Sequence, residues 1–256
     1  MARRGAKPSD PSRWVFNRLA RDYRARPAYP AALAARILAV AGGPGARVAD
    51  LGAGTGHLAV PLARLGARVD AVEPARAMLD VLEEDARGLA VTAVHAAAEE
   101  TGLPAGAFDL VLLADAAQWV DPDRAGREIA RLLAPAGALA VVEPRLAATP
   151  FLRAVSALLA RANPKARRVA PPVGLLFSVA GLGAPAEERL DDEVALEPGR
   201  LDAVLRSLSY VGPALGPRKL AEVLAGARAL AAAHGGAVWR RELVLRWAAR
   251  RAADAH

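Results

Sequence analysis

Val48-Ala-Asp-Leu-Gly-Ala-Gly-Thr-Gly-His57 joins a short apolar run, with an acid inside it, to glycines at every second position. A glycine-dense turn between a strand and a helix lets the backbone approach a ligand where a Cβ would block it, and glycine accepts backbone angles that other residues avoid. The stretch therefore predicts a nucleotide-like ligand held by Asp50, Gly52, Ala53, Gly54, Thr55 and Gly56.

The next predicted strand, residues 67–73, ends on Glu73, which lies 21 positions after Gly52. A carboxylate at that position can accept hydrogen bonds from both hydroxyls of a ribose and would repel a 2′-phosphate. The dinucleotide fingerprint Gly-x-Gly-x-x-Gly requires glycine where this chain has His57. An unphosphorylated nucleoside derivative or NAD remains open, and a nicotinamide-dependent oxidoreductase is the less favoured function.

Apolar runs alternate with helical patterns along the chain. We predict strands at 48–51, 67–73, 91–95, 108–114, 138–143, 188–196 and 238–247. Helices are predicted at 10–23, 30–40, 56–65, 76–85, 151–160, from 200 and over 220–230, with one more opened by the capping pair Asp121-Pro122. Strands separated by amphipathic helices indicate right-handed crossovers and a doubly wound α/β sheet.

Further stretches follow the glycine turn in a set order: Ala97-Ala-Glu-Glu-Thr-Gly-Leu-Pro104, Ala107-Phe-Asp-Leu-Val-Leu-Leu-Ala-Asp115, Trp119, Asp121-Pro122 and Leu133-Ala-Pro-Ala-Gly-Ala-Leu-Ala-Val-Val-Glu143. In order and spacing the chain resembles the class I S-adenosylmethionine-dependent methyltransferases. Tyr23-Arg-Ala-Arg-Pro-Ala-Tyr-Pro30 and Ser207-Leu-Ser-Tyr-Val211 are similar to segments of the small-molecule branch of that family, the type 11, trans-aconitate methyltransferase-like branch.

The resemblance implies a Rossmann-like seven-stranded sheet with strand order 3-2-1-4-5-7-6, strand 7 antiparallel, and a small helical cap or lid. It also implies transfer of a methyl group from S-adenosyl-L-methionine to an unidentified small molecule, at an O, N or C nucleophile, with S-adenosyl-L-homocysteine as product. The predicted single domain spans residues 11–250: N-terminal helices over the site at 11–44, a cofactor-binding core at 45–143, a cap or lid at 144–186 and C-terminal elements at 187–250. Residues 1–10 and 251–256 are predicted tails.

Ligands of open α/β sheets lie beyond the carboxyl ends of the strands, where the strand order reverses. The residues predicted to meet there are Asp50, Gly52, Gly54, Gly56, Glu73, Pro74, Ala98, Glu99, Ala114 and Asp115. The glycine turn would hold the methionine end of the cofactor, and Asp50 would bind its ammonium. Glu73 would bind the ribose, and residues 98 and 99 would lie along the edge of the adenine. The competing interpretations are a helix cap for Asp50, a solvated strand end for Glu73 and a surface charge for Glu99.

Three aromatic residues are candidates for the substrate pocket: Tyr23, Trp119 and Tyr210. Packing in the core explains each of them equally well. The resembled family often carries Asp at the position of Ala97, and its small-molecule branch usually carries His at that of Gln118. No catalytic residue is therefore assigned, and a non-catalytic relative that binds the cofactor as a regulatory or partner subunit stays open.

Composition narrows the function classes. The chain has 256 residues, no cysteine and a net charge of +7. The basic residues are scattered, so a nucleic-acid partner or an RNA methyltransferase is disfavoured, and Lys165, Arg167 and Arg168 offer only a weak hint of an anionic substrate. Scattered histidines (His57, His95, His234, His256) predict no metal site. The absence of a long apolar run favours a cytoplasmic enzyme, monomeric or homodimeric.

Overall fold

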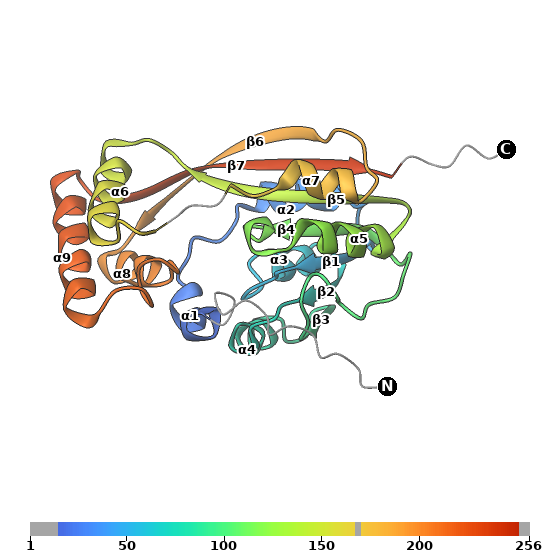
Figure 1. Cartoon of the computed structure of the whole chain (residues 1–256), viewed down its shortest axis with the longest axis horizontal. Coiled ribbons are helices and arrows are strands. Elements are labelled where there is room, and N and C mark those ends of the chain that lie inside the picture. Colours follow the sequence, from blue (N-terminus) through green and yellow to red (C-terminus); the bar gives the residue numbers. More distant parts are fainter. Residues whose placement is uncertain (1–14, 167–169, 251–256) are drawn as a thin grey trace.

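The computed structural model describes residues 15–166 and 170–250 and has one mixed sheet at its centre (Figure 1). Its strands are β1 (Arg47–Leu51), β2 (Arg68–Val72), β3 (Val91–Val94), β4 (Phe108–Ala114), β5 (Leu133–Leu146), β6 (Ala186–Leu196) and β7 (Ala237–Ala249). The order across the sheet is β3-β2-β1-β4-β5-β7-β6. The pairs among β1 to β5 are parallel, and β7 is antiparallel to β5 and β6. The predicted strand order and reversed last strand are confirmed.

Helices cover both faces of this sheet. They are α1 (Phe16–Tyr23), α2 (Ala31–Val40), α3 (Ala59–Arg64), α4 (Arg76–Asp85), α5 (Pro122–Leu132), α6 (Pro150–Ala162), α7 (Val173–Val179), α8 (Pro198–Arg206) and α9 (Pro217–Ala233), with a short 3₁₀ helix at Ala117–Trp119. Helices α2 and α3 pack on one face, and α5 and α7 on the other. The fold is thus the doubly wound α/β class predicted.

The central strands are apolar because both of their faces are buried. In β4, Leu110 and Leu112 face the α2–α3 layer, whereas Val111 and Leu113 face the α5–α7 layer, and all four are fully buried. A parallel strand covered on both sides has no polar face, which explains the nearly continuous apolar run in the sequence. The backbone ladder therefore holds the carboxyl ends of β1 and β4 rigidly side by side.

A third apolar cluster lies beyond this α/β core. It joins α6, α8 and α9 to Leu196 at the end of β6 and to Ala237 and Trp239 at the start of β7. In Figure 1 these three helices stand together at the left, at the end of the long β6–β7 ribbon. The long ribbon therefore carries α8 back toward α1, with which it is in contact.

Several element boundaries differ by one or more residues from the sequence prediction, and two of the differences have a clear physical reason. Helix α3 begins at Ala59 rather than 56 because Gly56 has φ +86°, which an α-helix does not accommodate. Strand β5 runs from 133 to 146, beyond 138–143, because Leu133 pairs with Phe108 of β4 and because β7 pairs with β5 as far as Leu146. The predicted start of the first helix, at Asp10-Pro11, lies outside the described residues.

The stretch 163–185, for which the sequence predicts no regular element, contains α7. That helix packs closely on α5, since a Cβ on Gly126 would lie 2.6 Å from the Cβ of Val179. Leu176 and Phe177 are buried in the same apolar layer. This part of residues 144–186 is therefore a layer of the core. Lys165 is exposed, while Arg167 and Arg168 lie outside the described residues.

None of the helices within the described ranges is long and apolar enough to cross a membrane.

Candidate functional site

The glycine turn between β1 and α3 has the backbone conformation that its sequence predicts. Gly52, Gly54 and Gly56 have φ values of +76°, +58° and +86°, a region that favours glycine. The N–H groups of Gly52 and Ala53 donate to the carbonyl of Val72, at 2.8 and 3.1 Å, and so anchor the start of the turn to β2. A Cβ on Gly52 would lie 2.7 Å from that of Ala116, so the turn is also tightly packed.

Two buried oxygens next to this turn have no hydrogen-bond partner among the described residues: Oδ1 of Asp50 and Oγ1 of Thr55. Asp50 is 2% exposed at the end of β1. Burial, together with the nearby charge of Glu73, raises its pKa to about 7, although the N–H of Ala59 acts in the opposite direction. A buried oxygen without a hydrogen-bond partner reduces the stability of the fold unless a ligand supplies the partner. This end of β1 is therefore a candidate ligand site.

Glu73 follows directly on β2 and turns toward the glycine turn. Its carboxylate accepts from the N–H of Gly54 at 3.0 Å and from the N–H of Ala75 at 2.9 Å. Because β1 and β2 pair in parallel, with Leu51 opposite Val72, the two strand ends lie together. The carbonyl of the next residue, Pro74, bonds Nε2 of His95 at 3.0 Å.

The loop after β3 lies against the start of α5. Ala98 is buried, and the buried carboxylate of Glu99 accepts from the N–H of Asp121 at 2.9 Å. Thr101 donates from both its N–H and its hydroxyl to Glu128, at 2.9 and 2.6 Å. The loop backbone is therefore fixed by two carboxylates.

The carboxyl end of β4 carries Ala114 and Asp115. Asp115 has φ +50°, and among the described residues no other non-glycine has positive φ. Its carboxylate is 3.2 Å from Nη1 of Arg26, and Nε2 of Gln118 donates to its carbonyl at 2.9 Å and to its Oδ1 at 3.2 Å. Burial raises the pKa of Asp115, while Arg26 opposes that change. Strained, charged residues of this kind cluster at binding sites.

An aromatic layer covers the glycine turn. The Tyr23 ring lies 3.6 Å from the Cβ position of Gly54 and stacks on the His57 ring at 5.7 Å, while Arg26 lies over it at 4.0 Å. Burial and the charges of Arg26 and Arg241 lower the pKa of His57 to about 4, so this imidazole is neutral at pH 7.

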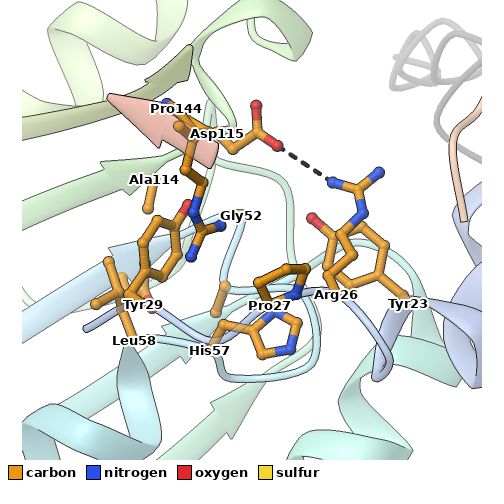
Figure 2. A pocket seen from close by; sticks show the side chains of 13 residues that line it. Tyr23, Arg26, Pro27, Tyr29, Gly52, His57, Leu58, Ala114, Asp115 and Pro144 are labelled. Carbon is orange, nitrogen blue, oxygen red and sulfur yellow. Dashed lines mark hydrogen bonds and ion pairs between the residues drawn. The ribbon is translucent and has the colours of Figure 1, made fainter. Parts of the chain in front are cut away.

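These elements enclose a cavity of about 50 Å³ at the carboxyl ends of β1 and β4 (Figure 2). Its walls come from the N-terminal segment, the glycine turn, the end of β4, and strands β5 and β7. The lining residues are Tyr23, Arg26, Pro27, Tyr29, Asp50, Gly52, Ala53, His57, Leu58, Ala114, Asp115, Pro144 and Arg241. The structure thus brings together the predicted Asp50, Gly52, Ala53, Ala114, Asp115 and Tyr23.

Other predicted residues lie elsewhere. Trp119 packs edge-on against Phe16 of α1, with ring centroids 5.1 Å apart. Tyr210 does not line the cavity; it packs on the apolar cluster of α6, α8 and α9, and its carbonyl accepts from Asn163. His234 follows the end of α9 beside Phe151, and His256 lies outside the described residues. Within the described ranges no group of His, Asp or Glu has an arrangement that could hold a metal ion.

Sequence reasoning missed two arginines of the cavity. Arg26 lies inside the quoted Tyr23–Pro30 segment, but nothing local distinguishes it from Arg24, which is exposed. Arg241 is 6% exposed on β7, where it pairs with Asp192 at 2.6 Å and lies 5.1 Å from the Tyr29 ring. A signal for Arg241 was present: strand alternation places it on the same face as the buried Trp239 and Leu243.

Comparison with known proteins agrees with this geometry. Residues 49–141 match the family described as methyltransferase domain. Over 119 residues, or 46% of this chain, the sequence is 44% identical to an uncharacterized methyltransferase of Mycobacterium bovis, 47% of which is covered. Over 78 residues it is 40% identical to the ubiquinone biosynthesis O-methyltransferase of Methylocella silvestris, covering 30% of each chain. The chain thus spans at most about half the length of these curated relatives.

A solved structure from Anaeromyxobacter dehalogenans, provisionally named a type II methyltransferase, is similar over most of the fold. It is 29% identical, with a TM-score of 0.65, over 89% of this chain and 98% of that one. Residues 49–141 thus match a methyltransferase domain, and the strand order is that of the Rossmann-like fold of S-adenosylmethionine-dependent methyltransferases.

Proposed function

We propose that the protein transfers a methyl group from S-adenosyl-L-methionine to a small-molecule acceptor by in-line displacement. The observation that carries the proposal is the buried Asp50, whose unpaired Oδ1 lies beside the glycine turn within a methyltransferase domain. A cationic ligand group next to that oxygen would provide the missing partner.

The methionine end of the cofactor fits this turn. Its ammonium would stabilise the ionised form of Asp50, whose pKa of about 7 leaves it poised between the two forms at neutral pH. The N–H groups of residues 52–54 already bond Val72 and Glu73, so the proposed donor to the cofactor's carboxylate is the buried hydroxyl of Thr55, which has no partner among the described residues.

The adenosine end fits the two neighbouring loops. Glu73 would accept hydrogen bonds from the ribose hydroxyls, because its carboxylate lies beside the glycine turn just after β2, and Pro74 would line the same edge. For adenine we propose contacts from the backbone at Ala98 and Glu99, because the carboxylate of Glu99 already accepts from Asp121.

Methyl transfer requires little covalent chemistry from the protein. The cofactor, when bound, supplies a methyl group on a sulfonium that leaves as a neutral thioether. The chain then has to align the acceptor and exclude water. Asp115, beside Ala114 at the end of β4, and Tyr23 are proposed to line the acceptor side, with Trp119 farther out. No general base is assigned, and Tyr210 receives no support from its packing.

A small acceptor is favoured over a macromolecule because Tyr23, Arg26, Pro27 and Tyr29 line a cavity of only about 50 Å³. The O-methyltransferase relative from Methylocella silvestris is consistent with that class. We propose the organisation predicted from the sequence as well, with residues 11–44 over the site and 45–143 as the cofactor-binding core. Within 144–186, only the region of α6 is proposed to act as a cap.

Titration calorimetry with S-adenosylmethionine, S-adenosylhomocysteine and NAD tests the proposal. We expect both adenosyl ligands to bind and NAD not to bind. A screen of small-molecule acceptors, with S-adenosylhomocysteine formation as the readout, then tests turnover. Adenosyl binding without turnover on any acceptor would favour the non-catalytic regulatory relative, and NAD binding alone would favour an oxidoreductase.

A further inference from the structure

Residues 22–28, which we call the strap, cross over the cavity between α1 and α2. After Tyr23 the strap contains no regular helix or strand, and Pro27 is its one buried residue. Its backbone hydrogen bonds are local, from Ala25 to Asp22 and from Arg26 to Tyr23, at 3.1 and 3.0 Å. Segments with so few buried contacts open at low free-energy cost.

Arginine side chains hold the strap to the rest of the molecule. Three of them, from α8 and β7, bond every third residue of the strap: Arg206 to Asp22 at 3.0 Å, Arg200 to the carbonyl of Ala25 at 3.0 Å, and Arg241 to the carbonyl of Ala28 at 2.6 Å. On the opposite flank, Arg24 of the strap pairs with Glu84 and Asp85 of α4. The strap is thus tied at both sides by polar contacts.

Arg26 is the strap residue that reaches inward. Its Nε donates to Oγ of Ser207 at 2.9 Å and its Nη2 to the carbonyl of Ser207 at 3.0 Å, while Nη1 pairs with Asp115 at 3.2 Å (Figure 2). Ser207 is fully buried at the end of α8, and Asp115 ends β4. One planar guanidinium therefore joins the strap to two distant elements in a fixed geometry.

The strap forms one wall of the cavity, and the sheet edge forms the other. Tyr23, Arg26 and Pro27 face Gly52 and Ala114 across a space of about 50 Å³. That volume holds a few water molecules, whereas pockets for drug-sized ligands measure roughly 300 to 1,000 Å³. The sheet wall is fixed by backbone ladders on both sides of β1 and β4, so the strap is the wall that can yield.

We infer that the strap is a gate through which cofactor and acceptor reach the cavity, and that Arg26 is its latch. This inference rests on the proposed function of the cavity. Opening breaks the bonds of Arg26 to Ser207 and Asp115 together, which frees Tyr23 to leave the glycine turn. Closing restores them and excludes water from the transferring methyl group.

Two measurements on Arg26→Gln test the latch. Amide hydrogen exchange of peptides covering residues 22–29, without ligand, is expected to be about tenfold faster than in the wild type, because charge-assisted bonds are lost. In stopped-flow binding of S-adenosylhomocysteine, both the association and the dissociation rate constants should rise, since a gate limits passage in both directions.

The control is Arg218→Gln, which removes an exposed ion pair with Glu222 within α9 and should behave as the wild type. Ser207→Ala removes one acceptor of Arg26. It should raise the exchange rate of the strap and both rate constants of ligand binding, each by less than Arg26→Gln does. If Arg26→Gln does not fold, Ser207→Ala tests the latch in its place.

Unchanged strap exchange in Arg26→Gln would overturn the latch. So would a faster dissociation with unchanged association, which would mean that Arg26 contacts the ligand directly. If the wild type binds no S-adenosylhomocysteine, the proposed function fails and the gate with it. A wild type that binds, beside a variant whose strap exchanges normally, overturns the latch alone.

Discussion

At the scale of single residues, Asp50 and Glu73 are two neighbouring buried carboxylates that differ in their hydrogen bonding. Glu73 accepts hydrogen bonds from two backbone N–H groups, whereas Oδ1 of Asp50 has no partner among the described residues. The charge of Glu73 also raises the pKa of Asp50. Such a pair suits a ligand with hydroxyl donors at one end and a cation at the other.

Replacing Glu73 with alanine should weaken S-adenosylhomocysteine binding by about tenfold or more, because the loss of a charged hydrogen-bond partner costs ~1.5 to 3 kcal/mol. Titration calorimetry measures the change. The matched control is Glu222→Ala, an exposed carboxylate on α9, which should leave the affinity unaltered. An affinity for Glu73→Ala equal to that of the control would exclude the ribose contact.

Asp50 should make stability depend on pH. Its folded-state pKa of about 7 lies above its ordinary value of 3.8, so the folded state retains the proton longer than the unfolded state does. The free energy of unfolding therefore falls as the pH rises from about 4 to about 7, and the loss is complete above pH 7. Asp50→Asn should match the wild type near pH 4 and exceed it at pH 8 by up to about 4 kcal/mol.

Urea unfolding at the two pH values checks this difference. The same group should affect binding: the affinity for S-adenosylhomocysteine should rise between pH 6 and 8, as Asp50 ionises opposite the ammonium. 5′-Methylthioadenosine, which lacks the amino-acid end, is the control and should bind with the same affinity at pH 6 and at pH 8. A pH-independent affinity for the first ligand would remove Asp50 from the ammonium site.

At the scale of elements, the glycine turn combines two separate requirements. Positive φ angles set the backbone conformation of the turn. The absence of side chains lets Gly52 pack against Ala116 and lets the Tyr23 ring pack over Gly54. The strand ladder between β1 and β2 then holds the turn next to Glu73. A sequence can specify the angles, but the close approach depends on β4 and the residues after it.

Gly52→Ala separates these requirements when it is compared with Gly42→Ala. Both glycines have positive φ, +76° and +99°, but only at Gly52 does a new Cβ meet an atom closely, Ala116 Cβ at 2.7 Å. We expect both variants to lose stability through backbone strain, and Gly52→Ala to lose about 1 to 3 kcal/mol more through overpacking. Urea unfolding would refute this explanation if the two losses were equal.

At the scale of the whole molecule, the long β6–β7 ribbon returns the C-terminal part of the chain to the N-terminal strap. Arg241 on β7 and Ser207 after α8 both bond strap residues. Cofactor binding in the cavity should therefore stabilise the N-terminal, central and C-terminal parts of the fold together.

A single cooperative thermal shift should result. S-adenosylhomocysteine at 100 times its Kd adds about 2.7 kcal/mol, which corresponds to a rise in Tm of roughly 5 to 10 °C for a domain of this size. Differential scanning calorimetry measures it, and NAD at the same concentration should produce no shift. Two separate transitions, of which only one moves, would contradict a coupled fold.

The sequence by itself determined the alternation of strands and helices, the glycine turn and the proximity of Glu73 to that turn, whereas the strand order was implied by the family resemblance. Periodicity, turn residues and capping pairs are local, and a parallel sheet brings all its strand ends to one edge, so these features follow from short stretches. The capping of α5 by Asp121, which accepts from the N–H groups of Asp123 and Arg124, is of the same kind.

Only the tertiary structure decided which side chains close the cavity. Arg26 meets Ser207 across 181 positions, and Arg241 meets Ala28 across 213. The same distant packing directs Tyr210 to the cluster of α6, α8 and α9 and lays α7 on α5. No local pattern encodes such contacts, because each joins elements that lie far apart in the sequence.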